Sequence, residues 1–228
     1  MAAISTRLDE AARKLVSDSV ARAEAGTAGE IVTIITEQSD DYADIALAWS
    51  VAVAMLALAV LSIVPDFFLG LIDRLTGTWA NEWTPREVLV LAGSLAALKF
   101  IGMTVLQMWK PLRFALVPHA VKAARTRARA VTFFKVGAER RTHGRTGILI
   151  YLSTRERRAE IVADEAIASK VADEVWGEAM AAMLAQIRAG HLAEGMAAAV
   201  ERVGTVLAEH FPRAEDDVNE LPDRLIEV

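Results

Sequence analysis

The chain of 228 residues has room for one ordinary domain with a membrane segment, or for two small domains. Its net charge of −5 argues against nucleic-acid binding, because phosphate contacts need a basic surface. The absence of cysteine excludes disulfides, thiolate catalysis and thiolate zinc sites, and the four histidines are scattered without metal-ligand spacing. The apolar fraction of 54% is high for a soluble protein, and the excess lies between Ile45 and Trp109.

The residues before that apolar region predict a helix and a strand. Apolar side chains recur at helical spacing on one face of residues 5–25, which we therefore predict to be an amphipathic helix. The β-branched run Glu30–Thr36 (EIVTIIT) is typical of a strand. The polar residues that follow it, Ser39, Asp40 and Asp41, predict the start of a helix that runs into the apolar region.

Two long apolar stretches predict a transmembrane hairpin. Residues 45–64 (IALAWSVAVAMLALAVLSIV) contain no charge, proline or glycine. At 1.5 Å per residue, a helix of this length covers about 30 Å, the hydrocarbon thickness of a bilayer. Residues 88–109 are also long enough to span, and the tryptophans near both ends of this stretch are typical of membrane interfaces. Because the connector is short, we expect the two spans to be antiparallel neighbours in a lipid bilayer.

A lysine, Lys99, lies near the middle of the second stretch. On insertion scales a lysine at mid-bilayer costs about 2.5–3.5 kcal/mol. One interpretation is that Lys99 faces the partner helix, another subunit of a homo-oligomer or a polar cavity, where it would serve an ion or proton pathway. The other is a tolerated lysine that snorkels to the interface or makes an oligomer contact.

The distribution of basic residues predicts the orientation of the hairpin. The connector contributes only Arg74 and Arg86, whereas ten Lys and Arg residues follow the second stretch between Lys110 and Arg145. The positive-inside rule then places both termini in the cytoplasm, as in a multi-pass protein of the inner (plasma) membrane. The basic segment is expected either to lie against anionic headgroups or to be the solvated face of a cytosolic helix.

The residues after the hairpin alternate between helix and strand patterns. The almost entirely apolar run GILIYL predicts a central strand, and a turn of four residues after it predicts an antiparallel hairpin with the next strand. In chain order we predict a helix at 117–143, strands at 147–152 and 157–163, and helices at 167–189 and 192–210.

Neither flank of the hairpin has enough elements for a core of its own, so the two should fold together. The predicted fold class is α/β, with helices on both faces of a small mixed sheet that a two-helix transmembrane hairpin interrupts. The predicted organisation is a first part of the α/β domain at 1–44, the hairpin at 45–109, the second part at 110–212 and a flexible tail at 213–228.

An ordered set of residues carries a resemblance to a known family. These residues are Glu24, Thr27, Gly29, Glu30, Ser39, Tyr42, Phe134, Thr142, the RTGILI run at 145–150, Ser153, Arg157, the IVAD run at 161–164, Phe211 and Pro212. In this order they resemble the TPM domain, named after a thylakoid lumen protein, a photosystem II repair protein and a nematode receptor regulator. The chain looks like a bacterial, membrane-anchored form of it.

The resemblance implies a Rossmann-like α/β/α sandwich, a proposed phosphatase activity and a metal site for calcium. It also implies a role like that of the family members that resemble assembly or repair factors for membrane complexes. Two features depart from the pattern. The membrane hairpin divides the domain, and Ala166 stands where similar sequences tend to carry glycine.

Strand directions predict where four carboxylates lie. If the first two strands are parallel and the second and third antiparallel, Asp164 lies at the sheet edge where Glu30 begins its strand. Glu24 and Glu165 would join them, and such a set suits a hard cation such as calcium or magnesium. Alternatively, Asp164 caps the next helix and the glutamates are solvated. A rival acidic set at the opposite edge, Glu37, Asp40 and Asp41, is expected to cap the helix that leads to the membrane.

Three functions stay open from the sequence. The first is a non-enzymatic adaptor that binds or helps to assemble an unidentified membrane protein, with a structural divalent cation. The second is a weak metal-dependent phosphatase, although Ser153 and Thr154 have no histidine base nearby and no catalytic motif is present. The third is a transport or channel subunit built from oligomerised hairpins with Lys99 in the lumen. Whether the protein is an enzyme is left undecided.

Overall fold

The computed structural model describes residues 8–77, 83–137, 146–213 and 224–228. The chain divides into two compact units. Unit 1 combines residues 1–40 with 119–228, and unit 2 consists of residues 41–118. The two flanks of the apolar region therefore fold together, and the apolar region forms a unit of its own.

Unit 1 is built on a four-stranded mixed sheet in the order β3-β2-β1-β4. β1 (Glu30–Thr36) pairs in parallel with β2 (Gly147–Ser153), and β2 pairs in antiparallel fashion with β3 (Arg158–Ala163). This confirms the predicted hairpin between the second and third strands. The short strand β4 (Ile226–Glu227) adds to the other edge of β1 in parallel. The prediction of a loose tail is therefore wrong for residues 224–228, because their backbone pairs with an edge of β1 that would otherwise be open.

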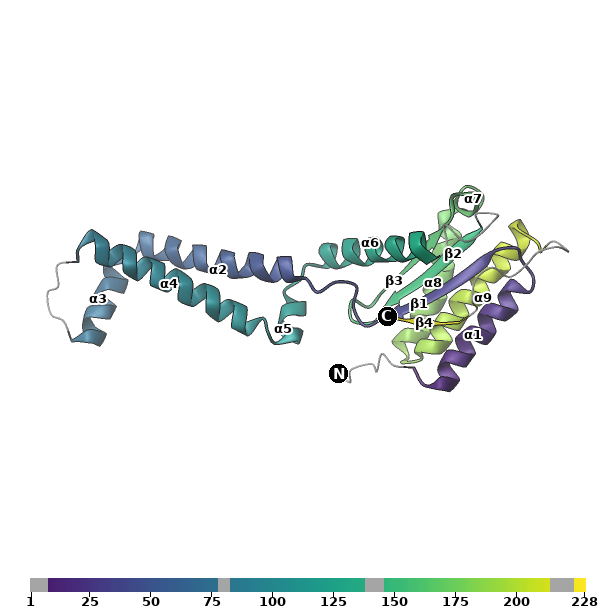
Figure 1. The fold of residues 1–228 in the computed structure, drawn as a ribbon, viewed down its shortest axis with the longest axis horizontal. Coiled ribbons are helices and arrows are strands. Elements are labelled where there is room, and N and C mark those ends of the chain that lie inside the picture. Colours follow the sequence, from purple (N-terminus) through teal and green to yellow (C-terminus); the bar gives the residue numbers. More distant parts are fainter. Residues whose placement is uncertain (1–7, 78–82, 138–145, 214–223) are drawn as a thin grey trace. The chain divides into compact units, whose positions relative to one another are not determined.

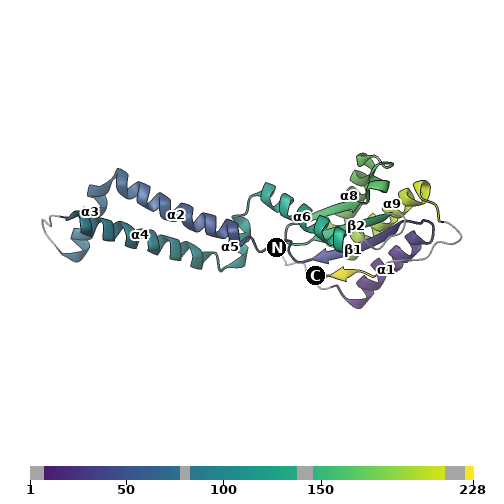
Figure 2. The same cartoon turned by 45° about the horizontal axis from the view of Figure 1, so that its top comes forward.

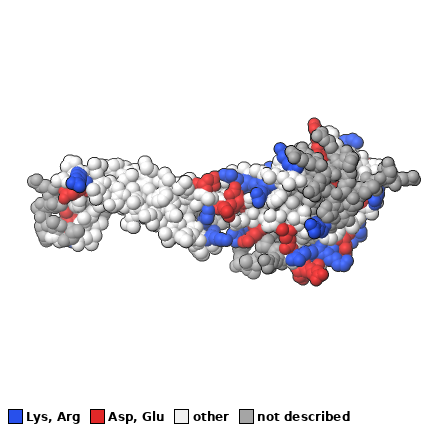
Figure 3. Space-filling model, viewed as in Figure 1, with Lys and Arg blue, Asp and Glu red and all other residues white. Residues whose placement is uncertain are grey.

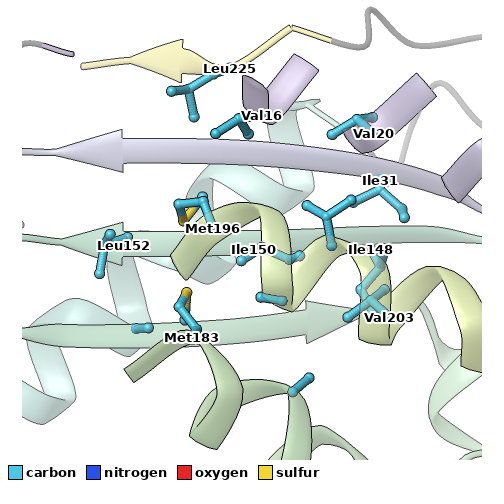
Figure 4. Close-up of a cluster of buried hydrophobic side chains, with 14 of the residues drawn as sticks. Val16, Val20, Ile31, Ile148, Ile150, Leu152, Met183, Met196, Val203 and Leu225 are labelled. Atoms are coloured by element: carbon cyan, nitrogen blue, oxygen red, sulfur yellow. The ribbon is translucent and has the colours of Figure 1, made fainter. Parts of the chain in front are cut away.

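Helices cover both faces of this sheet (Figures 1 and 2). One face packs against α1 (Glu10–Glu24), α8 (Asp173–Arg188) and α9 (Leu192–His210), and the other packs against α6 (His119–Gly137). All residues of β1 and β2 are buried, so their side chains alternate between two cores. Figure 4 shows the larger core, where Ile148, Ile150 and Leu152 meet the helix residues Met183, Met196 and Val203.

The predicted helix at 167–189 is wrong in one respect, because it is divided. A single turn, α7 (Glu165–Ala168), is followed by a break before α8. Ile167 and Val171 on the two sides of the break are both buried, and Ala172 has an extended backbone (ψ 148°) as the N-cap of α8. Helical periodicity does not reveal this turn, because both residues remain on the apolar pattern.

The described residues of unit 2 form four helices. The two long ones are α2 (Ala43–Ile63) and α4 (Pro85–Leu106), which pack against each other. Both are long and apolar enough to span a membrane, and little of either is buried: 11% of the apolar window of α2 and none of that of α4. On the face in view in Figure 3, much of the surface over these helices carries no Lys, Arg, Asp or Glu. The shorter helices α3 (Pro65–Thr76) and α5 (Lys110–Ala115) were not predicted.

We expect opposite outcomes from one substitution at two helical glycines of unit 1. A Cβ at Gly204 in α9 would lie 2.5 Å from Ala23 Cβ in α1, whereas a Cβ at Gly177 in α8 meets no atom within 4 Å. Gly204→Ala should therefore force the helices apart and destabilise the protein by about 1–3 kcal/mol. Gly177→Ala should stabilise it by about 0.5–1 kcal/mol through helix propensity. Thermal unfolding of both variants measures the difference, and equal stabilities would contradict the close packing of α1 on α9.

Candidate functional site

The predicted carboxylate site lies at the amino end of β1. Glu30 is the register partner of Gly147 in β2, and Asp164 donates its backbone N–H to the Gly147 carbonyl (3.0 Å). Glu30 and Asp164 thus lie at one edge of the sheet, on either side of a residue without a side chain. Glu24, Glu30 and Asp164 are 8%, 6% and 6% exposed, whereas Glu165 is exposed.

Two of these carboxylates accept hydrogen bonds from backbone N–H groups. Glu24 Oε1 accepts a hydrogen bond from the Ile31 N–H (2.7 Å), and Asp164 Oδ2 accepts one from the Gly147 N–H (3.1 Å). Asp164 is the N-cap residue of α7, but its side chain does not cap that helix. Within the described ranges, no three His, Cys, Asp or Glu side chains gather in a way that could hold a metal ion. The calcium or magnesium site stays a prediction.

The rival acidic set forms ion pairs. Asp40 lies 3.4 Å from Arg125 of α6, and Glu37 pairs with Arg155 in the turn after β2. The expectation that these residues cap the helix to the membrane is wrong, because the N-cap of α2 is Tyr42. Their charges therefore bind α6 and the turn after β2 to the segment that follows β1.

The carboxyl ends of β1 and β2 carry a group of buried polar side chains, which we call the polar network. Ligands of open α/β sheets bind in the crevice outside the carboxyl ends of parallel strands, so this edge is the candidate functional site. All members are between 0% and 8% exposed. The polar network consists of Ser39, Lys122, Thr126, Tyr151, Ser153 and Glu156.

A chain of hydroxyl groups forms one half of the polar network. Ser39 Oγ donates to Thr126 Oγ1 (3.4 Å), which donates to the Lys122 carbonyl one turn earlier in α6 (2.9 Å). The Tyr151 hydroxyl lies 3.0 Å from Ser39 Oγ and shares a hydrogen bond with it. The chain links β2, the segment after β1 and helix α6.

The carboxylate of Glu156 organises the other half. It accepts the backbone N–H of Ser39 through Oε1 (3.0 Å) and the Ser153 hydroxyl through Oε2. Burial lowers the pKa of the Lys122 ammonium, and the negative charge of Glu156 opposes this shift. Burial also raises the pKa of the Tyr151 hydroxyl, against the effect of its hydrogen bond to Ser39.

The polar network can hold protons at defined atoms, but its groups are engaged with one another. Ser153 donates to a carboxylate rather than to an imidazole, which is not the arrangement that activates a serine nucleophile. A buried amine with a lowered pKa beside a carboxylate is typical of functional sites and also of structural ion pairs. What the geometry fixes directly is the path of the backbone around Ser39 and Glu156.

Sequence reasoning noticed Ser39 as a helix-start residue and Ser153 as a hydroxyl without a histidine base, both also within the family resemblance, but it did not assign Lys122, Thr126 or Glu156 to a site. Glu156 lies in a four-residue turn that reads as solvent-exposed, and Lys122 belongs to a basic stretch. The signal that points to Glu156 is its position just beyond the carboxyl end of a fully apolar strand. Thr142 and Arg145, which also belong to the family resemblance, lie outside the described residues.

Lys99 does not face the partner helix. Its side chain on α4 is exposed at the outer surface of the pair formed by α2 and α4, so the interpretation that it points between these two helices is wrong. An oligomer contact and snorkelling along the helix both fit an outward position.

We expect Glu156→Ala to destabilise the protein, because the Ser39 N–H and the Ser153 hydroxyl lose their buried acceptor. Each unsatisfied group costs about 1–3 kcal/mol. The matched control is Glu165→Ala, which removes an exposed glutamate and should change stability by less than about 0.5 kcal/mol. Thermal or chemical unfolding in detergent measures both, and a Glu156→Ala protein as stable as the control would contradict the role of this carboxylate.

The lowered pKa of Lys122 predicts a pH dependence of stability. Between its folded pKa and its ordinary value of 10.5, the unfolded chain binds more protons at this position than the folded chain. The free energy of unfolding should therefore rise with pH in this window. Compared with Lys122→Met, the wild type should gain stability as the pH rises through this window, and the measurement stops below about 10, where tyrosine titrates in the unfolded chain. Parallel pH profiles of the two proteins would be inconsistent with a buried ammonium.

Comparisons with known proteins agree with this fold. Residues 111–206 match the TPM phosphatase family model, described as the TPM domain. The structure is similar to the NMR structure of the BA42 protein from the psychrophilic bacterium Bizionia argentinensis, with a TM-score of 0.56 and 18% sequence identity over 100% of each chain. At that identity the likeness concerns the fold alone. No curated protein matches the sequence. The second flank and the last residues of unit 2 thus carry a TPM domain match.

Proposed function

We propose that the protein is a membrane-anchored binding module, in which unit 2 spans the bilayer as a hairpin and unit 1 engages a membrane protein partner. The observation that carries the proposal is the low burial of α2 and α4, two helices of 21 and 22 residues that are long and apolar enough to span a membrane. The core helix of a soluble protein would be mostly buried. In lipid, such an outer surface is favourable, and helices satisfy their own backbone groups there.

The residues at the two ends of the hairpin support this placement. Thr84 and Glu87 form a capping box at the start of α4, and Trp83 donates its indole N–H to Asp73 Oδ2 (3.4 Å). At the other end the indole N–H of Trp49 donates to the Leu116 carbonyl (3.1 Å). Tryptophans at both ends of a pair of apolar helices are typical of membrane interfaces.

The distribution of Lys and Arg residues supports an orientation of the hairpin with unit 1 on the cytoplasmic side. The described connector carries Arg74 and Arg86, whereas α5 and α6 together carry seven Lys and Arg residues. The positive-inside rule then places unit 1 in the cytoplasm, at the inner membrane. In unit 1, β1 and β2 are parallel through a long crossover with helices on both faces, which supports a Rossmann-like assignment.

The polar network supports binding more than catalysis. Its serine and glutamate are bonded to each other, and its lysine is 8% exposed, so a substrate would have to displace existing contacts to reach them. Around it, α6 presents Arg125, Arg127 and Arg129 to solvent, and two of these already pair with acidic side chains, Asp40 and Glu160. An acidic segment of a membrane protein could exchange with such exposed pairs, which contribute about 0–1 kcal/mol each.

A phosphatase is the second candidate, favoured by the match of residues 111–206 to a family model that carries this name. Such an activity would need a metal-activated water, and the carboxylates at the amino end of β1 do not gather as a ligand set. Assays of the wild type and Asp164→Asn with calcium, with magnesium and with EDTA separate the candidates. We expect equal background rates; a metal-dependent rate lost in Asp164→Asn would establish the enzyme instead.

Single cysteines can test the membrane topology, because the natural chain has none. Leu75→Cys places a thiol on α3 at a position that is 78% exposed, and Lys14→Cys places one on the outer face of α1. A membrane-impermeant maleimide applied from the periplasmic side of intact spheroplasts should label Leu75→Cys only, and lysis should make Lys14→Cys reactive. Both proteins should stay in the membrane pellet after carbonate extraction, and recovery in the soluble fraction would refute the anchor.

A further inference from the structure

A polar layer joins the two apolar helices at the end of unit 2 where α2 begins and α4 ends. Ser50 Oγ lies 3.1 Å from Thr104 Oγ1, and Gln107 Nε2 donates to the Ala46 carbonyl (2.9 Å) and to Ser50 Oγ (3.1 Å). Ser50 and Gln107 are 1% and 4% exposed. Hydrogen bonds of this kind fix the register of two helices in lipid.

Beside this layer lies a cavity of about 280 Å³. Since a water molecule takes up about 30 Å³ in the liquid, there is room for about nine waters or for a small polar group. One part of its lining is polar and includes Arg113 from α5, and the other part is apolar. The polar residues are Ser50, Thr104, Gln107 and Arg113, and the larger apolar ones are Leu47, Phe100 and Met108.

The polar lining has hydrogen-bonding capacity that the described residues do not use. Gln107 Oε1 and Arg113 Nε are buried, and neither has a hydrogen-bond partner in the described ranges. A buried polar atom without a partner costs about 1–3 kcal/mol. A ligand that accepts from Arg113 and donates to Gln107 would recover this free energy, so its head must carry an anion next to a hydroxyl or ammonium group.

The position of the cavity indicates where this ligand comes from. Leu47 and Met108 are 56% and 76% exposed, so the cavity opens on the outer surface of the helix pair. Ser50, the deepest lining residue of α2, is about 10 Å along the axis from the first residue of the helix. Trp109, which is 66% exposed, follows the end of α4 as the N-cap residue of α5. In a membrane this is the depth of the headgroups and the glycerol backbone.

We infer that this cavity binds the head of a single phospholipid whose phosphodiester carries a hydroxyl or ammonium donor, as in phosphoglycerol and phosphoethanolamine heads. Arg113 takes the phosphate, because guanidinium–phosphate hydrogen bonds are charge-assisted. Gln107 Oε1 takes the donor, and the acyl chains follow Leu47 and Met108 into the bilayer. The inference rests on the membrane insertion of unit 2 proposed above.

The test titrates short-chain phosphatidylglycerol into the full-length protein in a neutral detergent, with short-chain phosphatidylcholine and inorganic phosphate as parallel probes. Arg113→Gln should weaken phosphatidylglycerol binding by about tenfold or more, as expected for the loss of a charge-assisted contact. Lys110→Gln removes the same charge from an exposed position on the same helix outside the cavity, and should change the affinity by less than about twofold. If both variants weakened phosphatidylglycerol binding equally, the binding would reflect general attraction to a basic surface, and the proposed site would be wrong.

A second variant tests the headgroup contact. The wild type should prefer phosphatidylglycerol to phosphatidylcholine, whose head has no donor, and Gln107→Leu should abolish this preference. Displacement of the lipid by inorganic phosphate at similar concentrations would identify a simple anion site instead. All variants are first recovered from carbonate-washed membranes. If the wild type is absent there, the anchor and this site both fail, whereas a membrane-bound protein without lipid preference overturns the site alone.

Discussion

The parallel pairing of β1 with β2 is the constraint on which the rest of the architecture depends. Seven register pairs run from Glu30 with Gly147 to Thr36 with Ser153. Parallel strands need a crossover, and in this protein the crossover contains all of unit 2. If unit 2 spans a membrane, the chain must cross an even number of times, because one crossing would leave the two strands on opposite sides. Two apolar helices satisfy this condition, and the pairing in turn brings both flanks into one core.

Buried carboxylates complete the backbone hydrogen bonding where the strand pairing stops. β4 reaches only Ile34 and Ile35, so the Ile31 N–H on that edge of β1 is met by Glu24. Asp164 likewise accepts the backbone N–H of Gly147, and Glu156 accepts that of Ser39 at the opposite end of the strands. An unpaired backbone N–H in the interior costs about as much as a lost hydrogen bond. This shared role accounts for the burial of these three acids.

The sequence predicted the elements well because each has a clear period. The limits of Glu30–Thr36 and Leu192–His210 agree with β1 and α9, since a β-branched run and an apolar helical face end at distinct residues. Two features of unit 1 were not predicted. β4 has two residues and is defined only by its partner, and the break between α7 and α8 keeps its apolar residues in phase. Short pieces whose conformation depends on tertiary contacts leave no periodic signal.

The site was harder to predict than the fold for a related reason. Strand directions sufficed to bring Glu30 and Asp164 to one edge, but not to show that Asp164 would bond Gly147. The polar network joins residues from the segment after β1, from α6 and from β2 with its turn. Nothing local marks Lys122 as a buried residue among the basic residues of its helix. Such a set emerges only from the packing of α6 on the sheet.

The order of β1, the apolar helices and β2 along the chain determines when the strands can pair during synthesis. β1 leaves the ribosome before the apolar helices, and β2 follows them. At about 5–20 residues per second, β1 waits on the order of 10 s for its neighbour, during which its apolar side chains and backbone edges have no sheet to join. If unit 2 inserts into a membrane as proposed, that insertion comes first, and unit 1 completes its fold afterwards. A nascent chain stalled between Thr36 and Gly147 would expose an unpaired β-strand.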